Sequence, residues 1–452
     1  MTQKRILISL FAGAGGLDLG LEQAGFNTII ANELEPQACE TLRKNKELCN
    51  LRSSEVDAFI DKSLEQKCFK QLTQAEKESF FKRIRKHGTK EKYLQETTVI
   101  EGDIRTIASS EFSSYLNGDD LYCIAGGPPC QPFSKAGKQK SLDCTKNGDL
   151  FFEFVRLVKD LKPNWFIFEN VKGITFTKTD VIYQKCNSCG SLKLAPFEVR
   201  QDFISKSNCE VECLYCGGRN TEWFVNNEAG GSLKIIFNEF EKLDYKCSYK
   251  VLNAADYGAP QIRERLFIVG SREGKEFKWP APTHKKPNGA NGQYELFSAE
   301  DIKPWVTMYE SLWPGVHPVY GKFDKSKAKL WVKNVVRPHD EPVTWDFDRP
   351  SPTVGAHQGA KLAFAPLGIP EKQLYRQQWA TRGRRQGDTP PVDVEHQYLS
   401  DGELLTLQTF PEWWYLHGTR MQRAFQIGNA VPPILGRAIG EALIKSEETN
   451  DS

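Results

Sequence analysis

The hydrophobic positions at the start of the chain follow the order strand, turn, helix, strand. The apolar run Arg5–Phe11 predicts a buried strand, which leads through glycines into an amphipathic helix at Leu17–Ala24. A second strand at Thr28–Ala31 ends beside a carboxylate, Glu33, and Pro36 suits the first turn of the next helix. This order is typical of a βαβ unit that opens a doubly wound, Rossmann-like parallel sheet in an α/β protein.

Further apolar runs continue the α/β pattern to about residue 270. Strands are expected at Thr97–Ile100, Leu121–Ala125, Trp165–Phe168, Tyr249–Leu252 and Leu266–Gly270, and helices at Phe151–Lys159 and Ser232–Leu243. Between Lys44 and Gln95 the chain is charged and rich in Lys, Glu and Gln, which indicates a helical insertion. The insertion is either an arm that faces a macromolecular partner or an inert helical hairpin.

The periodicity fades after Gly270, where Pro, Trp, Lys and Asn become frequent, and an apolar helical pattern returns from Ala424. The change indicates a second domain with another surface chemistry. Positive charges cluster within it, at Lys322, Lys325, Lys327, Lys329, Lys333 and Arg337, and again at Arg376, Arg382, Arg384 and Arg385. Such clusters are usually a solvated polar face, with phosphate contact as the functional alternative.

The composition excludes several classes of protein. With 452 residues, the chain is too long for a small disulfide-stapled scaffold, and its mean hydropathy of -0.50 and lack of a long apolar run exclude a membrane-embedded protein. Its start lacks a secretory signal, so we expect a cytoplasmic protein whose 12 cysteines are thiols, metal ligands or a nucleophile. The net charge of +2 excludes only a uniformly basic surface.

Three features at successive strand ends indicate a ligand site. The glycine turn, Phe11–Gly16, lets the backbone approach a ligand at a helix N-terminus, and Glu33 is placed to accept hydrogen bonds from ribose hydroxyls. Asp103 adds a carboxylate after the third strand. The spacing of the glycines is not that of a dinucleotide site, so an ordinary strand-to-helix corner remains the alternative for the turn by itself.

Cys130 follows the fourth strand in the rigid sequence Gly-Gly-Pro-Pro-Cys, and Glu169 ends the next one. A buried structural thiol and a surface carboxylate are the ordinary interpretations of these two residues. Their shared position at strand ends favours a nucleophile and a proton donor for covalent catalysis.

Two C-x-x-C-G sequences, at Cys186 and Cys189 and at Cys213 and Cys216, supply four thiolates from two turns. This pattern predicts a structural zinc ion in a knuckle inserted at 183–220, with reduced cysteines in an irregular loop as the alternative. Cys209 lies close enough in sequence to replace one ligand.

The ordered set of motifs resembles the C5-cytosine methyltransferase family over most of the chain. The matching blocks are Phe11–Gly16, Pro128–Ser134, Glu169–Val171, Gln261–Arg265, Glu403–Pro411 and Gly428–Pro433. The resemblance implies that the protein binds S-adenosyl-L-methionine, with Phe11 against the adenine. The residues it assigns to the cofactor are Phe11, Ala12, Gly13, Gly15, Gly16, Leu17, Glu33, Leu34, Asp103, Ile104, Pro128, Asn429 and Ala430.

The same resemblance assigns the catalytic roles. Cys130 is the implied nucleophile that adds to carbon 6 of cytosine, and Glu169 is the implied acid near N3 and the exocyclic amine. Arg263 and Arg265 are implied to fix the base, Arg265 at its O2 oxygen. The thiolate requirement predicts an electropositive setting that lowers the pKa of Cys130.

The family pattern also implies a domain organisation. A catalytic domain is expected at 1–270, with the insertions 44–95 and 183–220, a smaller target-recognition domain at 271–397, and a returning C-terminal segment at 398–452. Within the recognition interval, phosphate contact becomes the favoured interpretation for part of the positive clusters.

These expectations describe a DNA (cytosine-5-)-methyltransferase. It would methylate a flipped cytosine in a specific duplex sequence, act as a monomer on nucleoid DNA, and belong to a restriction-modification or related defence system. Two alternatives remain open. One is methylation of cytosine in tRNA, and the other is a catalytically silent DNA-binding homologue.

Overall fold

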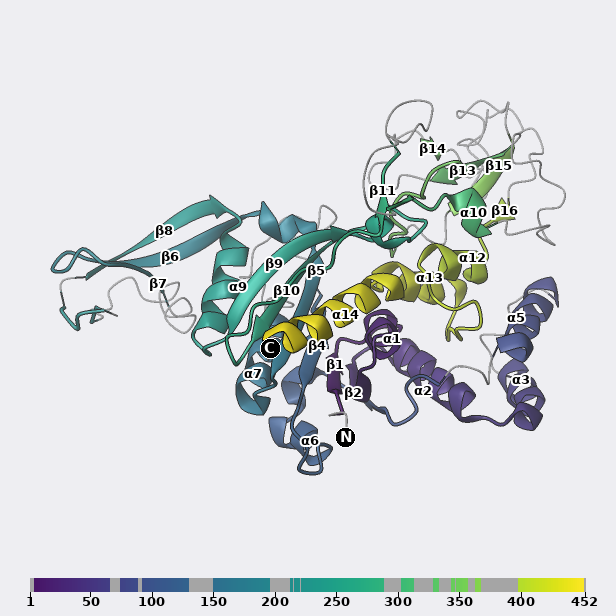
Figure 1. The fold of residues 1–452 in the computed structure, drawn as a ribbon, viewed down its shortest axis with the longest axis horizontal. Coiled ribbons are helices and arrows are strands. Elements are labelled where there is room, and N and C mark those ends of the chain that lie inside the picture. The colour runs from purple at the N-terminus through teal and green to yellow at the C-terminus, as the bar shows by residue number, and fades with distance from the viewer. Residues whose placement is uncertain are drawn as a thin grey trace, which may run out of the picture. The chain divides into compact units, whose positions relative to one another are not determined.

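A computed structural model shows a mixed α/β fold with a central sheet (Figure 1). The described residues are 4–65, 74–87, 92–129, 149–195, 212–213, 215–219, 221–287, 302–312, 328–332, 343–345, 347–356, 362–366 and 397–450. The chain forms two compact units. The first comprises Met1–Gly126, Leu252–Glu264 and Phe277–Ser452, and the second comprises Gly127–Val251 and Arg265–Glu276.

The first unit contains parallel strands in the order β3-β2-β1-β4. They are β1 (Ile6–Leu10), β2 (Asn27–Glu33), β3 (Thr98–Glu101) and β4 (Cys123–Gly126). Every residue of β1 is buried, which explains why its sequence is apolar at every position except Ser9 instead of alternating. The four strands predicted for this part of the chain are therefore confirmed, each within about two residues of its expected end.

The first helix of this unit packs against the last. Helix α1 (Gly16–Gln23) follows the glycine turn, and α14 (Pro433–Asn450) lies against it. The two backbones approach closely at Gly20, where a Cβ would lie 2.2 Å from the carbonyl oxygen of Pro433. Glycine is required there because any side chain would separate the helices.

The described part of the predicted insertion is helical and belongs to the core. It includes the end of α2 (Pro36–Asn50) and the helices α3 (Val56–Leu64) and α5 (Gln74–His87). Their buried apolar side chains share one cluster with those of α12 (Asp401–Leu407) and of the segment 410–416. These helices are therefore packed elements of the first unit.

The second unit is built around β5 (Trp165–Val171), which pairs with β10 (Glu264–Ser271) in antiparallel register. Strand β9 (Lys246–Asn253) follows β10 in the sheet, and α7 (Asp149–Leu161) and α9 (Gly231–Glu241) supply apolar faces. The core is aromatic: the rings of Phe166 and Phe240 stack with centroids 4.0 Å apart. The antiparallel pairing of β5 with β10 differs from the parallel sheet that the sequence predicted.

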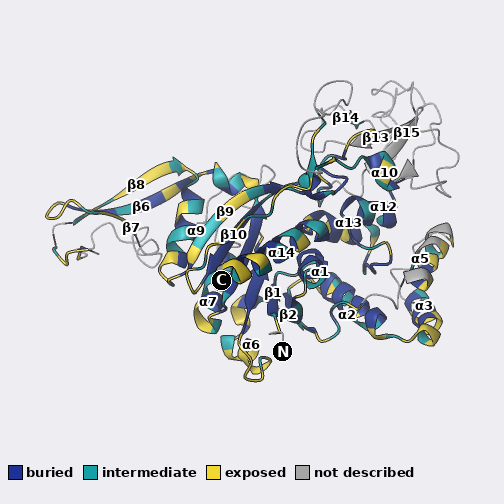
Figure 2. Cartoon of the chain, viewed as in Figure 1, coloured by how far each residue is buried: buried dark blue, intermediate teal, exposed yellow. Residues whose placement is uncertain are grey.

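A separate three-stranded sheet, which the sequence did not predict, carries the cysteine turns. Strands β7 (Leu192–Leu194), β6 (Lys178–Cys186) and β8 (Thr221–Ala229) pair in that order. We call these strands and the turns at their ends the cysteine lobe. Strand β8 is mostly exposed, whereas β6 buries alternate residues (Figure 2). The base of β6 lies against α9, where the hydroxyls of Thr179 and Ser232 are hydrogen-bonded at 2.6 Å.

The remaining elements are short. In the interval after Ser271, an antiparallel sheet has the order β14-β13-β15-β16. Its strands are β13 (Ala328–Val332), β14 (Val343–Trp345), β15 (Leu362–Pro366) and β16 (Gln397–Tyr398). The other elements are α6 (Ser109–Ser114), β11 (His284–Lys285), β12 (Lys303–Pro304), α10 (Met308–Leu312) and α13 (Arg420–Asn429). Among the described residues, none of the helices has the length and apolarity to cross a bilayer.

Candidate functional site

The glycine turn has a fixed and partly strained backbone. Phe11, with φ of 56°, is a non-glycine residue in the left-handed region, and Gly13 and Gly15 have φ of 56° and 80°. The amide of Ala12 donates to the carbonyl oxygen of Asn32 at 3.0 Å, and that of Gly15 donates to Ala12 at 2.9 Å. The turn is therefore fastened to the end of β2 and to itself. Strain of this kind is typical of ligand-binding turns.

Glu33 joins the end of β2 to this turn. Its Oε2 accepts a hydrogen bond from the amide of Gly13 at 2.7 Å, and its Oε1 accepts from the amides of Leu34 and Glu35. Burial raises the pKa of Glu33, and these backbone hydrogen bonds oppose that shift. The carboxylate is thus held in one orientation beside the turn.

One side of the glycine turn is open and the other is closed. A Cβ on Gly13 would meet no heavy atom of the described residues within 4 Å, so that part of the structure leaves space for a ligand over Gly13. A Cβ on Gly16 would lie 2.2 Å from the carbonyl oxygen of Val431 and 3.1 Å from the side chain of Ala430. The turn therefore meets the start of α14, next to Asn429 and Ala430. This surface fits a ligand that needs close backbone contact and an acceptor for hydroxyl groups.

Asp103 lies at the end of the neighbouring strand. Its carboxylate accepts from Nε of Arg105 at 2.9 Å and from the amide of the same residue at 3.1 Å. The hydrogen bond from the Arg105 side chain lowers the pKa of Asp103. Ile104 is buried beside it, and Leu34, at the end of β2, is 56% exposed. An exposed leucine beside an open turn is suited to contact with an apolar or aromatic ligand surface.

The sequence did not single out a buried acid beneath the turn. Asp18, in α1, accepts a short hydrogen bond from the hydroxyl of Ser9 in β1 and is 1% exposed. Its second oxygen, Oδ2, has no hydrogen-bond partner within the described part of the chain and lies 3.9 Å from where a Cβ of Gly15 would be. Burial raises the pKa of Asp18 to about 7. A polar residue in the first turn of an amphipathic helix gave no signal of this, because its burial depends on β1.

In the second unit, Glu169 and Arg265 form an ion pair with Nε and Oε1 3.0 Å apart. In the antiparallel register Arg265 faces Val171, so Glu169 lies two residues along the same face of the sheet. Both side chains are nearly buried, with 15% of Arg265 and 11% of Glu169 exposed. Burial lowers the pKa of Arg265, while the charge of Glu169 opposes that shift.

The loop that leads to Cys130 is packed against Glu169. A Cβ on Gly127 would lie 2.4 Å from Oε2 of Glu169, so only glycine fits there. The side-chain amide of Asn170 donates to the carbonyl oxygen of Pro128 at 3.2 Å. Cys130 itself lies outside the described residues. The chain two residues before it is therefore fixed to the strand that carries Glu169.

Arg263 is placed differently from Arg265. It is 0% exposed, and its guanidinium donates to the carbonyl oxygens of Val354, Gly428 and Ala430 at 3.0, 2.7 and 2.9 Å. Gln408 donates to Ala430 as well, at 3.0 Å. In the structure, Arg263 therefore joins its own segment to two other backbone segments of the first unit, at residue 354 and at residues 428–430, and presents no surface to a base. The sequence did not predict that Gln408 links these segments, because its partners Gln261, Ile427 and Ala430 lie elsewhere in the chain.

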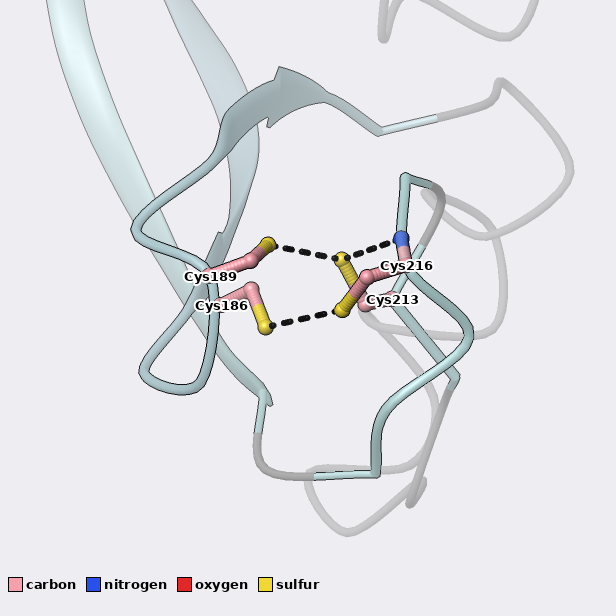
Figure 3. A group of neighbouring side chains, drawn as sticks. All are labelled: Cys186, Cys189, Cys213 and Cys216. Atoms are coloured by element: carbon pink, nitrogen blue, oxygen red, sulfur yellow. Dashed lines mark hydrogen bonds between the residues drawn. The ribbon is translucent and has the colours of Figure 1, made fainter.

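The four cysteines of the two C-x-x-C-G turns converge in the cysteine lobe (Figure 3). The Sγ atoms of Cys186 and Cys216 are 3.8 Å apart, those of Cys189 and Cys213 are 3.7 Å apart, and all four lie within 4.8 Å of one another. Cys186 and Cys213 are buried, and the other two are exposed. Cys209 lies outside the described residues.

Of the positive clusters, only Lys329, in β13, has a described backbone. The remaining members lie outside the described residues: Lys322, Lys325, Lys327, Lys333, Arg337, Arg376, Arg382, Arg384 and Arg385. Their interpretation as phosphate contacts stays a prediction.

Comparison with known proteins identifies the family. The sequence matches the C-5 cytosine-specific DNA methylase family over residues 6–75, 59–200 and 220–445. A type II methyltransferase of Picosynechococcus, M.AquIA, is 32% identical over 309 residues, which cover 68% of this chain and 87% of that protein. Another, M1.HphI of Haemophilus parahaemolyticus, is 26% identical over 446 residues, which cover 97% of this chain and 86% of that protein.

The fold agrees with this assignment. The structure of the Entamoeba histolytica methyltransferase EhMeth aligns with a TM-score of 0.50 and 13% identity, covering 99% of each chain. The mixed α/β fold with a central sheet is consistent with a methyltransferase that uses S-adenosylmethionine. The chain belongs to the C-5 cytosine-specific DNA methylase family. The matched residues leave out 201–219, the stretch that contains Cys213 and Cys216.

Proposed function

We propose that this protein transfers a methyl group to carbon 5 of a flipped cytosine in a specific duplex DNA sequence, through a covalent adduct with Cys130. The observation that carries the proposal is the buried Glu169–Arg265 pair, 3.0 Å between Nε and Oε1, within the ordered family motifs. The motifs suggest the reaction class, and the pair supplies a proton donor beside a fixed cation.

The chain's own residues would act in a defined order. The Cys130 thiolate adds to carbon 6 of the cytosine while Glu169 donates a proton to N3, which makes carbon 5 nucleophilic. Arg265 orients Glu169 and the base edge by donating hydrogen bonds. After carbon 5 has been methylated, a base removes the carbon-5 proton, the thiolate leaves carbon 6, and N3 returns its proton to Glu169, which restores the aromatic ring. Arg263, being fully buried, would hold the surrounding loops in place without touching the base.

The glycine turn would hold S-adenosylmethionine, which supplies an electrophilic methyl group. The turn and the helix N-terminus would be contributed by Phe11, Ala12, Gly13, Gly15, Gly16 and Leu17. The rest of the binding surface would be formed by Glu33, Leu34, Asp103, Ile104, Pro128, Asn429 and Ala430. Three observations support this. The space over Gly13 is open, Glu33 is held beside it by backbone donors, and Leu34 is exposed.

The test uses the full-length protein, labelled S-adenosylmethionine and three substrates: duplex DNA, duplex DNA with 5-fluorocytosine, and tRNA. We expect methylation of duplex DNA and covalent trapping on the fluorinated duplex. Both should be lost in Cys130→Ala, whereas a Cys247→Ser variant should retain them as a matched control. Methylation of tRNA alone would refute the DNA assignment, and an unchanged rate in Cys130→Ala would refute the covalent mechanism.

The biological setting and the domain roles rest on similarity. The relatives named above are type II methyltransferases, which supports a role in a restriction-modification or related defence system. We propose that 271–397 recognises the target, that 1–270 and 398–452 form the catalytic domain, and that a monomer acts on DNA in the cytoplasm. A bisulfite map of DNA from expressing cells should show one methylated sequence context, and methylation without any context would contradict a recognition domain.

We also propose that Cys186, Cys189, Cys213 and Cys216 bind one zinc ion. Four thiolates around tetrahedral zinc, with Zn–S bonds of about 2.3 Å, place their sulfur atoms about 3.8 Å apart. The Sγ separations of 3.7 and 3.8 Å fit that arrangement, and they are too long for disulfides. Closed coordination by four thiolates supports a structural role, because no ligand position is left for a substrate.

The metal is tested by elemental analysis of the purified protein. We expect about one zinc per chain. The ion should be lost in a Cys213→Ser, Cys216→Ser double variant and retained in Cys247→Ser. Protein that contains no zinc, or that keeps it in the double variant, would contradict the assignment. A Cys209→Ser variant should keep the metal if the four named cysteines form the complete set.

A further inference from the structure

The Lys44–Gln95 insertion has no part in the function proposed so far, yet it contacts the block that precedes α13. The ring of Tyr93 stacks on Trp413 with an interplanar angle of 7° and centroids 6.3 Å apart. The side chain of Asn45 both donates to and accepts from the backbone of Tyr415, each at 2.9 Å. Phe59 packs edge-on against the Tyr415 ring, with centroids 6.1 Å apart. The insertion therefore holds residues 413 and 415 on either side of Trp414.

Trp414 contacts the glycine turn directly. Its Nε1 donates to the carbonyl oxygen of Ala14 at 3.0 Å, and its side chain is 1% exposed. Its ring also closes one side of Gly15, where a Cβ would lie 3.4 Å from Cζ2. Trp414 belongs to neither of the residue sets that the family motifs assign to the cofactor or to the base.

The hydrogen bond to Ala14 fixes the orientation of one peptide group. The carbonyl of Ala14 and the amide of Gly15 belong to the same planar peptide. The carbonyl is held by Trp414, and the amide donates to Ala12 at 2.9 Å. With both ends held, this peptide cannot rotate, and the neighbouring amides of the turn keep their directions. A turn that is fixed before the ligand arrives binds it at a lower entropic cost.

We propose that the insertion and the segment 413–415 brace the glycine turn, and that Trp414 is a positioning residue for S-adenosylmethionine. The inference rests on the proposed cofactor site. It gives the Lys44–Gln95 segment a role in cofactor affinity through packing, without contact with DNA or a partner.

The central experiment compares Trp414→Phe with Trp413→Phe by titration calorimetry with S-adenosylmethionine. Phenylalanine keeps an aromatic ring and removes the N–H donor. We expect the Kd for the cofactor to rise about tenfold in Trp414→Phe, which corresponds to about 1.4 kcal/mol. Trp413→Phe keeps an aromatic ring that can stack on Tyr93, so the brace is retained and the Kd should change less than twofold. Kinetics should show a higher KM for the cofactor and an unchanged kcat at saturation.

Several outcomes overturn the inference. An unchanged Kd in Trp414→Phe refutes a positioning role, and an equal rise in Trp413→Phe shows general destabilisation of the core instead. If the phenylalanine variant does not fold, benzothienylalanine at position 414 replaces only the N–H by sulfur and tests the same hydrogen bond. Wild-type protein that does not bind the cofactor contradicts the proposed function itself, so the two failures are distinguishable.

The contribution of the insertion is tested by Asn45→Ala. Loss of both hydrogen bonds to the backbone of Tyr415 frees the residue next to Trp414. We expect a cofactor Kd at least threefold higher and unchanged affinity for duplex DNA without cofactor. A cofactor Kd equal to that of the wild type would show that the insertion does not help to position the glycine turn.

Discussion

Nε of Arg265 lies 3.0 Å from Oε1 of Glu169, on one face of two antiparallel strands in the second unit. Neither residue is close to the other in sequence, and the register of β5 with β10 brings them together. An acid held by a buried cation has a fixed direction. It also depends on that cation, because an unpaired charge in a nearly buried position is costly.

Removing the acid should abolish the chemical step while leaving the fold intact. Glu169→Gln keeps a hydrogen-bond acceptor for Arg265 and loses the ionisable proton. We expect kcat to fall about 10²- to 10⁴-fold in single-turnover methylation, which is the usual contribution of general acid catalysis. The Kd for S-adenosylmethionine should not change. Glu222→Gln, which removes an exposed ion pair with Lys185, should retain full activity. A fully active Glu169→Gln enzyme would exclude this carboxyl as the proton donor.

The two arginines should respond differently to the same substitution. In Arg263→Lys the three backbone carbonyls lose the planar guanidinium that links them, and we expect the free energy of unfolding to fall by about 2–4 kcal/mol. In Arg265→Lys we expect kcat/KM for DNA to fall about tenfold or more, with a change in stability below about 1 kcal/mol. Urea denaturation and steady-state kinetics on both variants measure the contrast. Equal losses of stability would show that the two residues have the same role.

The buried Asp18 predicts a particular dependence of stability on pH. Its pKa is raised from 3.8 to about 7, so the folded protein retains a proton that the unfolded chain releases above pH 4. Stability from this group is therefore present below about pH 4 and is lost as the pH rises to about 7. Asp18→Asn removes the titration. Between pH 5 and pH 8 we expect the variant to gain about 3 kcal/mol relative to the wild type in urea denaturation. Parallel curves for the two proteins would contradict an elevated pKa.

Removal of the metal should unfold the cysteine lobe locally. The two turns meet chiefly at the four cysteines, with Ser191 Oγ 3.3 Å from Cys213 Sγ beside them, and β8 is mostly exposed, so among the described residues few other contacts hold the end of the lobe. After chelation we expect faster amide hydrogen exchange in β7 and at the Cys186 end of β6. Strand β5, which lies in the aromatic core of the same unit, should keep its protection and serves as the internal control. Unchanged exchange in β6 and β7 would show that the lobe is stable without a metal.

Much of the local structure could be predicted because it is encoded by neighbouring residues. The apolar run Ile6–Leu10 is buried as expected, and the glycine turn after it contains positive φ angles that glycine accommodates. The two C-x-x-C-G sequences predicted that their turns lie together, because each turn supplies two of the four sulfur atoms that a zinc site needs. The strands of the cysteine lobe were missed, since β8 alternates weakly and gains its pairing only from β6.

Other features depend on contacts between distant parts of the chain. Arg263 and Arg265 are two residues apart and look equivalent in sequence, yet one is enclosed by carbonyls from residues 354, 428 and 430 and the other is paired with Glu169. A charged helical segment at 44–95 could have been a free arm, because partners such as Trp413 and Tyr415 lie more than 300 residues later in the chain.

The sequence by itself determined the family and the positions of the first four strands, and it predicted the reactive residues, since these are carried by short motifs and local periodicity. The tertiary structure decided which arginine faces an acid, that the insertion packs under Trp413 and Tyr415, and that the indole of Trp414 holds Ala14. The physical reason is that hydrogen bonds and burial between remote segments depend on strand register and helix packing, which no single stretch of sequence specifies.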